Sequence, residues 1–256
     1  MNIGIQLFGF LWGLEGDVFT HLEKLPQAGI TEVEPCVATV AIPGLENVIW
    51  PLEWLEENAA RIRAMGLEIR SVHFVAGDLD ASAQALKTLA EKTGIRRYVL
   101  KTPGDMTPES LRAAAESYRS FADLLAPLGV TVLLHNEAAD IRTRVNGTTA
   151  YEMLLDLCQG KVAAQVDVGW VRFGGEDEVA FLRRNADRVR SLHYKDFPAG
   201  AQEPVDVTIG TGCVDTAACL TFALRRELPH YIDQERFGPD RAGDVARLVT
   251  SLEDLL

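Results

Sequence analysis

The sequence predicts a single (β/α)8 barrel, the TIM-barrel architecture, formed as one domain by residues 1–256. Short β-branched runs alternate with amphipathic helical stretches eight times, and this alternation implies parallel strands joined by helical crossovers. The length is usual for one such barrel, and no Pro- or Ser-rich linker divides the chain. The turn after the first strand reads GFLWGLEGD, so it lacks the GxGxxG pattern of the competing fold, a doubly wound sheet.

Eight predicted strands follow one another along the chain, each a run of mainly apolar and β-branched residues. They span Asn2–Phe8, Thr31–Pro35, Leu67–Phe74, Arg96–Leu100, Val130–Glu137, Val162–Val168, Val189–Lys195 and His230–Gln234. A helical pattern follows each strand, and the clearest helices are predicted over Trp50–Met65, Pro108–Ala126 and Pro239–Leu256. Several helices end at a glycine just before the next strand, a usual helix terminator: Gly29, Gly66, Gly94 and Gly129.

The composition is that of an ordinary globular protein, with 47% apolar and 24% charged residues. The formal net charge of −12 repels phosphate backbones and anionic membranes, so we expect neither nucleic acid nor a membrane as a partner. The four cysteines show no CxxC spacing, which suits a reducing cytoplasm. The apolar start has no basic residue before it and alternates like a strand, so it does not resemble a signal peptide. We therefore expect a cytoplasmic protein.

Polar residues interrupt the predicted strands near their carboxyl ends. They are Glu34, His73, His135, Glu137, Asp167, His193, Lys195, Asp233 and Glu235. In a (β/α)8 barrel the active site lies at this end and is built from several strands. One such residue alone is more often a turn former, but every strand end from the fifth to the eighth carries a carboxylate or an imidazole. Because side chains two apart on a strand share a face, the pairs 135/137, 193/195 and 233/235 are each expected to point the same way.

These strand ends predict a divalent metal site. Buried together without a cation, Glu137, Asp167, Asp233 and Glu235 would repel one another and would need protonation or counter-charges. A divalent metal resolves this conflict. Mixed imidazole and carboxylate ligands favour Mn²⁺, with Mg²⁺, Co²⁺ and Zn²⁺ as alternatives that the spacing leaves open.

Several short motifs occur in a fixed order along the whole chain: IGIQLF, GITEVEP, VDVGWVRFGG, HYKDF, and then IGTGCVD followed by HYIDQE. Their order and spacing resemble the xylose isomerase-like TIM barrel superfamily, in particular its sugar phosphate isomerase and epimerase branch. That family usually takes its metal ligands from the fifth to eighth strands, as Glu, Asp, His and Glu. The resemblance therefore implies Asp167 and His193 as ligands, with His135 and Asp233 where the family usually has glutamate.

A glutamate follows each of the two unusual ligands by two residues, so either member of each pair could bind the metal. With His135 and Asp233 as the ligands, Glu137 and Glu235 are the candidates for proton transfer. Lys195 is a third catalytic candidate, as an acid or as a donor to a substrate hydroxyl. A salt bridge from Lys195 to the neighbouring residue 196 or to Glu137 is the structural alternative.

The resemblance implies a metal-dependent isomerase or epimerase of a small sugar, keto-sugar or polyol that works through an enediolate intermediate. Glu34 and His73 are expected to bind sugar hydroxyls, and Trp170 to stack on the apolar face of the sugar. Pairing of Glu34 with an arginine, and capping of the barrel core by Trp170, are the alternatives. If a β-hydroxyl leaves from the same intermediate, the enzyme is instead a dehydratase or lyase of an inosose or keto-sugar.

Two other functional classes are open. A repair endonuclease would need a histidine-rich zinc site and a basic groove, and five histidines with a net charge of −12 argue against it. A non-catalytic relative would have lost the metal. The resemblance also implies a homo-oligomer, either a dimer or a tetramer.

Overall fold

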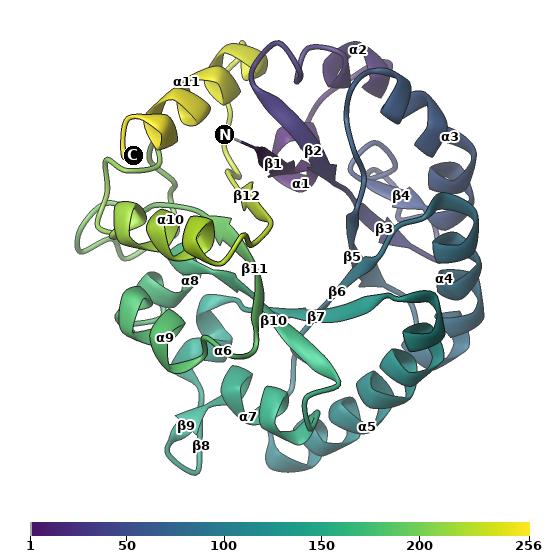
Figure 1. Cartoon of the computed structure of the whole chain (residues 1–256), viewed down its shortest axis with the longest axis vertical. Coiled ribbons are helices and arrows are strands. Elements are labelled where there is room, and N and C mark those ends of the chain that lie inside the picture. The colour runs from purple at the N-terminus through teal and green to yellow at the C-terminus, as the bar shows by residue number, and fades with distance from the viewer. Residues whose placement is uncertain (1) are drawn as a thin grey trace.

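The eight predicted strands form a parallel barrel in the computed structural model, which describes residues 2–256. Met1, the first residue of the predicted domain, lies outside the described residues. The barrel strands are β1 (Ile3–Gln6), β2 (Ile30–Glu34), β5 (Ser71–Ala76), β6 (Arg97–Lys101), β7 (Thr131–His135), β10 (Val162–Asp167), β11 (Val189–Tyr194) and β12 (His230–Ile232). Figure 1 shows these strands around a common centre, with β1 beside the last strand, β12.

Two seams close the barrel. β1 pairs in parallel with both β2 and β12, so that the first and last strands of the chain are neighbours. Between β2 and β5, a bridge joins Glu32 to Glu68, and the amide of Val33 donates to the carbonyl oxygen of Glu68 at 2.9 Å. Two short strands that the sequence did not predict, β3 (Cys36–Ala38) and β4 (Ile49–Pro51), extend the sheet beside β5.

The helices cover the outside of the barrel (Figure 1). The longer ones are α3 (Leu52–Ala64), α4 (Leu79–Thr93), α5 (Pro108–Leu125), α7 (Ala150–Leu157), α10 (Thr216–Arg225) and α11 (Arg241–Glu253). The shorter ones are α1 (Leu7–Leu11), α2 (Val18–Leu22), α6 (Ala138–Arg142), α8 (Val168–Phe173), α9 (Glu178–Arg184) and the 3-10 turn Ala126–Leu128. A hairpin of β8 (Arg144–Val145) and β9 (Thr148–Thr149) joins α6 to α7. The three clearest predicted helices correspond to α3, α5 and α11, and all four predicted glycine terminators have positive φ.

Local sequence explains where α5 begins. The side chain of Thr107 accepts a hydrogen bond from the amide of Ser110, and Pro108 occupies the first turn, where its missing N–H costs nothing.

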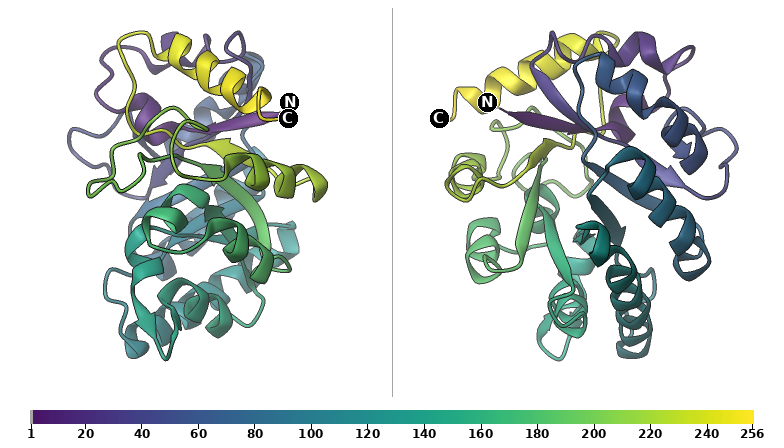
Figure 2. Two further views of the ribbon diagram at one scale, coloured as in Figure 1. Left: turned by 90° about the vertical axis from the view of Figure 1, so that its left-hand side faces the viewer. Right: turned by 45° about the vertical axis from the view of Figure 1, so that its right-hand side comes forward.

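The two ends of the chain lie close together. β1 begins beside the end of α11, and Figure 2 shows both chain ends at the same mouth of the barrel. No helix among residues 2–256 is long and apolar enough to cross a membrane.

The barrel interior is unusually polar for a packed core. On β2, Glu32 and Glu34 point inward while Val33 between them is fully buried on the other side of the strand. On β10, Gln165 and Asp167 take the inward positions in the same way, and neither is exposed to solvent. Buried polar groups lower stability unless they are hydrogen-bonded, so their partners reveal what the interior is built to hold.

Six of the eight strands are shorter than predicted, and this leaves predicted site residues outside β7, β11 and β12. β7 ends at His135, so Glu137 does not continue the strand but stands at the start of α6, with φ −113° and ψ 167°. Residues 135 and 137 therefore do not belong to one strand, although both side chains line the same cavity at the carboxyl ends of the strands. β12 ends at Ile232 and β11 at Tyr194, so Glu235 and Lys195 also lie in loops beyond the strands.

Candidate functional site

Four of the predicted residues meet at the carboxyl ends of neighbouring strands. His135 ends β7, Asp167 ends β10, His193 lies near the end of β11, and Asp233 directly follows β12. All four are buried, and one ligand atom from each lies within 4.8 Å of the others. The structure thus brings together the set that the sequence proposed as metal ligands. We call these four residues the metal cluster.

Two members of the metal cluster have buried polar atoms without a hydrogen-bond partner. Both ring nitrogens of His135 and Oδ2 of Asp167 lack one, and His135 Nε2 lies 4.0 Å from that oxygen and 3.9 Å from Asp233 Oδ2. Burial raises the pKa of Asp167 well above its ordinary range, and burial lowers the pKa of His135 well below its own. Each such orphaned group costs about 1–3 kcal/mol of stability. Two imidazoles and two carboxylates around one point are a donor set that fits a divalent cation.

The other oxygen of Asp167 has a structural role. Oδ1 accepts the amide hydrogen of Trp170 at 2.8 Å and so caps α8. Asn136, which follows His135, donates to the carbonyl of Asp167 at 3.1 Å and accepts its amide at 2.9 Å. This clamp fixes the ends of β7 and β10 side by side. Sequence reasoning did not assign this role to Asn136, because the bond joins residues 31 positions apart.

A buried carboxylate beneath the metal cluster orients His193. The Nε2 atom of His193 lies 2.6 Å from Glu34, and its Nδ1 lies 3.2 Å from Asp233 Oδ2. The Glu34 carboxylate on Nε2 fixes the orientation of the ring, so Nδ1, which faces Asp233, is the nitrogen that would bind a cation after losing its proton. Burial opposes the charge of His193, but Glu34 and Asp233 raise its pKa to about 10.

Glu34 is fully buried and satisfied by side chains alone. His73 Nε2 lies 3.0 Å from Glu34, and Gln165 donates to Glu34 at 2.9 Å. Although burial acts to raise it, the pKa of Glu34 is held well below its ordinary value by the imidazoles of His73 and His193. The predicted alternative of an arginine partner for Glu34 is wrong: arginine pairs instead with Glu32, through Arg97.

A cavity of about 210 Å³ opens above the metal cluster, and we call it the carboxyl-end cavity. Its lining includes most of the predicted site and several residues that the sequence did not single out. The lining residues are Gln6, Phe8, Cys36, His73, Val75, Lys101, His135, Glu137, Trp170, Lys195, Asp233 and Glu235. Glu34, Asp167 and His193 are not among its lining residues. Glu34 contacts His193 and His73 instead, and is therefore placed to orient these two imidazoles.

Two lysine–glutamate pairs face this cavity. Lys195 Nζ lies 2.6 Å from Glu235 Oε1 and 3.6 Å from Asp233 Oδ2, and it stands 4.4 Å from the ring centre of Trp170. Burial alone would lower the pKa of Lys195, but the surrounding carboxylates raise it above its ordinary value. The predicted salt bridge of Lys195 to residue 196 or Glu137 is therefore wrong, since its partner is Glu235.

The second pair joins Lys101 at the end of β6 to Glu137 at the start of α6, with 2.5 Å between Nζ and Oε1. Burial opposes the charge of Lys101, but Glu137 raises the lysine pKa above its ordinary value. Glu137 is held at this point by the helix itself, because Asp140 accepts the backbone amide of Glu137 at 2.8 Å. The sequence missed Lys101 because it ends a strand in which no histidine or carboxylate marks the rim.

Trp170 lines the cavity from the start of α8, and its stacking on a sugar stays a prediction. It lines the cavity, yet it is only 7% exposed and packs against Phe173 and Phe197 at ring-centre distances of 5.9 and 5.1 Å. One face of the indole is thereby fixed, and the Lys195 ammonium lies over the ring.

Two aspartates that the sequence did not identify organise the loops around the cavity. Asp196 accepts the amides of Gly210, Gly212 and Val214 at 3.0, 2.8 and 3.0 Å and so folds the IGTGCVD segment into a turn. Asp206 on the same loop accepts the amide of Glu235 at 2.5 Å. No spacing rule pairs such residues, because they come together only through the loop's own fold.

The parallel barrel and the buried cluster at the carboxyl ends of its strands define a (β/α)8 protein with a built polar site at the mouth where such barrels carry function. The chain belongs to the xylose isomerase-like TIM barrel family, which residues 23–254 match. No curated protein matches the chain as a relative.

Solved structures share the fold at low identity. A sugar phosphate isomerase/epimerase from Parabacteroides distasonis ATCC 8503 has a TM-score of 0.77 at 18% identity, covering 97% of this chain and 92% of that one. The probable 3-DHS dehydratase AsbF of Bacillus anthracis has a TM-score of 0.71 at 15% identity, over 99% of both chains. The IolI protein, solved with a bound zinc atom, has a TM-score of 0.71 at 14% identity, covering 100% of this chain and 98% of that one.

Proposed function

We propose that this protein is a divalent-metal-dependent isomerase or epimerase of a small sugar or keto-sugar. The observation that carries the proposal is the metal cluster, whose unpartnered atoms on His135 and Asp167 lie directly beneath a cavity with two lysine–glutamate pairs. The family and the names of the structural neighbours agree with this class of reaction.

His135, Asp167, His193 and Asp233 would hold the cation. When bound, it would polarise the substrate carbonyl and stabilise the negative charge that develops on the carbonyl oxygen. We favour Mn²⁺ from the mixed ligand set and keep Mg²⁺, Co²⁺ and Zn²⁺ as alternatives. Because the IolI protein was solved with a zinc atom, Zn²⁺ should be tested beside Mn²⁺.

The lysine–glutamate pairs would carry the proton transfers. At each pair a carboxylate can take a proton from carbon, while the neighbouring ammonium can give one. Removal of the proton next to the carbonyl leaves an enediolate. Return of the proton to the neighbouring carbon gives an isomer. Return of the proton to the opposite face of the same carbon gives an epimer. Glu137 and Glu235 are thus the proposed bases, and Lys195 is a proposed acid.

The remaining cavity residues would bind and orient the substrate. His73 lines the cavity while its Nε2 is engaged by Glu34 and Gln165, so the rest of its ring is available to a sugar hydroxyl. Trp170 would lie against the apolar face of the sugar. Glu34 acts through His193 and His73, so we propose it as a positioning residue and no longer as a direct contact to the sugar.

The test is hydrogen exchange in D₂O with Mn²⁺-loaded protein and a panel of ketoses and keto-inositols. The wild type should exchange a carbon-bound hydrogen without loss of water. Glu137→Gln and Glu235→Gln should each slow that exchange by about 10²–10⁴-fold, the usual contribution of a general base. Glu116→Gln, an exposed change on α5, is the matched control. No exchange by the metal-loaded wild type on any substrate, or full activity of both variants, would refute the proposal.

A dehydratase or lyase of an inosose or keto-sugar is the second candidate. The observation that favours it is the Lys195–Glu235 pair at 2.6 Å, which could protonate a departing β-hydroxyl. AsbF, a probable dehydratase, has the same fold. An enone product with its ultraviolet absorbance would identify this reaction. Endonuclease activity and a non-catalytic role are disfavoured by the −12 charge and by the metal cluster, and metal analysis of protein purified without chelators tests the latter.

A further inference from the structure

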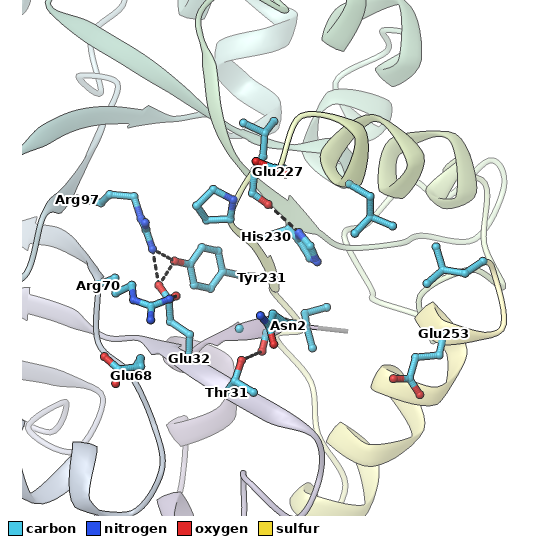
Figure 3. A pocket seen from close by; sticks show the side chains of 16 residues that line it. Asn2, Thr31, Glu32, Glu68, Arg70, Arg97, Glu227, His230, Tyr231 and Glu253 are labelled. Carbon is cyan, nitrogen blue, oxygen red and sulfur yellow. Dashed lines mark hydrogen bonds and ion pairs between the residues drawn. The ribbon is translucent and has the colours of Figure 1, made fainter.

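A second and larger cavity opens at the opposite mouth of the barrel, near the amino ends of the strands (Figure 3). Its volume is about 690 Å³, and among residues 2–256 it shares no lining residue with the carboxyl-end cavity. Small-molecule pockets usually enclose about 300–1,000 Å³. We call it the amino-end hollow, and its lining includes Asn2, Thr31, Arg70, Arg97, His230 and Leu256.

His230 offers this hollow a hydrogen-bond acceptor that nothing in the fold uses. The residue is only 7% exposed, and its Nδ1 lies 2.9 Å from the carbonyl oxygen of Leu228. A carbonyl can only accept, so Nδ1 carries the proton and Nε2 has a free lone pair. Nε2 is buried without a partner, and Figure 3 shows His230 among the side chains that line the hollow. Burial also lowers the pKa of His230, which keeps the ring neutral.

The inner wall of the hollow supplies donors whose charge is already balanced. Arg97 donates to Glu32 at 2.5 Å and to the hydroxyl of Tyr231 at 2.7 Å, and Tyr231 donates to Glu32 in turn (Figure 3). Arg70 adds a longer contact of 3.5 Å to the same carboxylate. The Nε–H of Arg97 is buried without a partner, and Arg70 is largely exposed, so both guanidinium groups retain donors.

The charges on the wall select among ligand classes. Four carboxylates and two guanidinium groups line the hollow, so an anion such as phosphate would be repelled. An ammonium ion could donate to His230 but could not accept from the guanidinium groups. A hydroxyl does both without charge. Leu224, Leu228 and Pro229 provide an apolar wall for the C–H face of such a ligand.

We propose that the amino-end hollow is a second binding site, specific for a small neutral polyhydroxylated ligand that donates to His230 Nε2 and accepts from Arg97 or Arg70. This site is independent of the reaction proposed above, because its residues and cavity are separate from the metal cluster. The ligand is of the polyol or sugar class, held by hydrogen bonds and one aliphatic wall.

The test measures binding of D-glucose, D-fructose and myo-inositol by saturation-transfer NMR and calorimetry, with inorganic phosphate and butylamine as charged probes. His230→Phe keeps the ring but removes the acceptor, and should weaken polyol binding at this site at least about tenfold, the effect of one lost hydrogen bond to a buried acceptor. Leu224→Trp narrows the hollow from its exposed rim and should weaken binding without touching the buried wall. His135→Ala impairs the carboxyl-end site and should leave this binding intact.

Each result decides the proposal. Because the carboxyl-end cavity is itself proposed to bind a sugar, the two hollow variants are compared in the His135→Ala background. Polyol binding that survives His135→Ala and is weakened at least about tenfold by each added hollow variant supports the proposal. Polyol binding that is abolished by His135→Ala, or that either added hollow variant leaves unchanged, overturns it. No binding of any polyol at millimolar concentration, or binding of phosphate or butylamine in its place, also overturns it.

Discussion

Replacing Asp167 by asparagine should have opposite effects on stability with and without metal. In the metal-free protein, Oδ2 of Asp167 is buried without a partner, and burial raises its pKa well above the ordinary range. Asparagine retains an oxygen for the Trp170 amide, which Oδ1 accepts at 2.8 Å, but carries no charge. Replacing a buried carboxylate, whose ionisation burial opposes, by a neutral amide should raise the free energy of unfolding of the metal-free protein by about 1–3 kcal/mol.

With metal bound, the wild type should be more stable than Asp167→Asn. A cation present at about 100 times its Kd stabilises the folded state by about 2.7 kcal/mol. For a domain of this size each kcal/mol raises Tm by about 2–4 °C, so wild-type Tm should rise by about 5–10 °C. Asp167→Asn loses one anionic ligand, and its rise should fall below about 2 °C at the same metal concentration.

The assay is a calorimetric or fluorescence melt of chelator-treated protein, titrated in turn with Mn²⁺, Mg²⁺, Co²⁺ and Zn²⁺. Asp123→Asn is the matched control, because Asp123 is an exposed carboxylate on α5 that pairs with Lys161. The Tm of Asp123→Asn should match that of the wild type, both with and without metal. Equal metal shifts in wild type and Asp167→Asn, or a metal-free variant less stable than wild type, would refute the assignment of Asp167 as a ligand.

Three further predictions concern groups around the site. Burial raises the pKa of Asp140 from 3.8 to about 6, so the wild type should lose about 2 kcal/mol of stability relative to Asp140→Asn as pH rises from 4 to 6, measured by urea unfolding. A difference in the free energy of unfolding between the two proteins that stays constant from pH 4 to 6 would contradict the raised pKa of Asp140. Asp206→Ala should accelerate amide exchange at Glu235 by about 10- to 100-fold in hydrogen-exchange mass spectrometry, and an unchanged rate would show that the 2.5 Å bond is dispensable. Gly212→Ala would place a Cβ 2.3 Å from the Phe197 carbonyl oxygen and should destabilise by about 1–3 kcal/mol, whereas Gly104→Ala, with open space around it, should be neutral in the same melt.

The strands and the inner half of the site could be predicted from sequence because both follow short-range patterns. A strand alternates its side chains, and parallel strands end at one mouth, so the polar residues at the ends of the fifth to eighth strands could be placed at one rim from their positions. The choice of His135, Asp167, His193 and Asp233 as ligands came from the family resemblance, and that they bind a metal stays a prediction. That residues 1–256 form one domain, and that the protein is a homo-oligomer, stay predictions, and light scattering tests the second.

The outer half of the site depends on loops, where alternation no longer applies. Glu137 was expected to continue the strand of His135, but β7 ends two residues earlier than predicted, and Glu137 caps α6 with its carboxylate paired to Lys101. Asp196 and Asp206 could not be found in the same way. Their hydrogen bonds are to backbone amides up to 30 residues away, and any residue type except proline supplies such an amide.

The two departures from the family pattern explain why the site has two layers. Where the family usually has a glutamate that both binds metal and moves protons, this chain has His135 or Asp233 and, two residues later, a separate glutamate. All four residues line the cavity, but only His135 and Asp233 belong to the buried metal cluster, whereas Glu137 and Glu235 each stand beside a lysine. A carboxylate bound to a cation is a weaker base than one beside an ammonium that water and substrate can reach. If the roles are divided in this way, the glutamine variants of Glu137 and Glu235 should lose proton exchange yet keep the full metal-induced rise in Tm. Loss of both together would show that the glutamates are ligands, as in the family's usual arrangement.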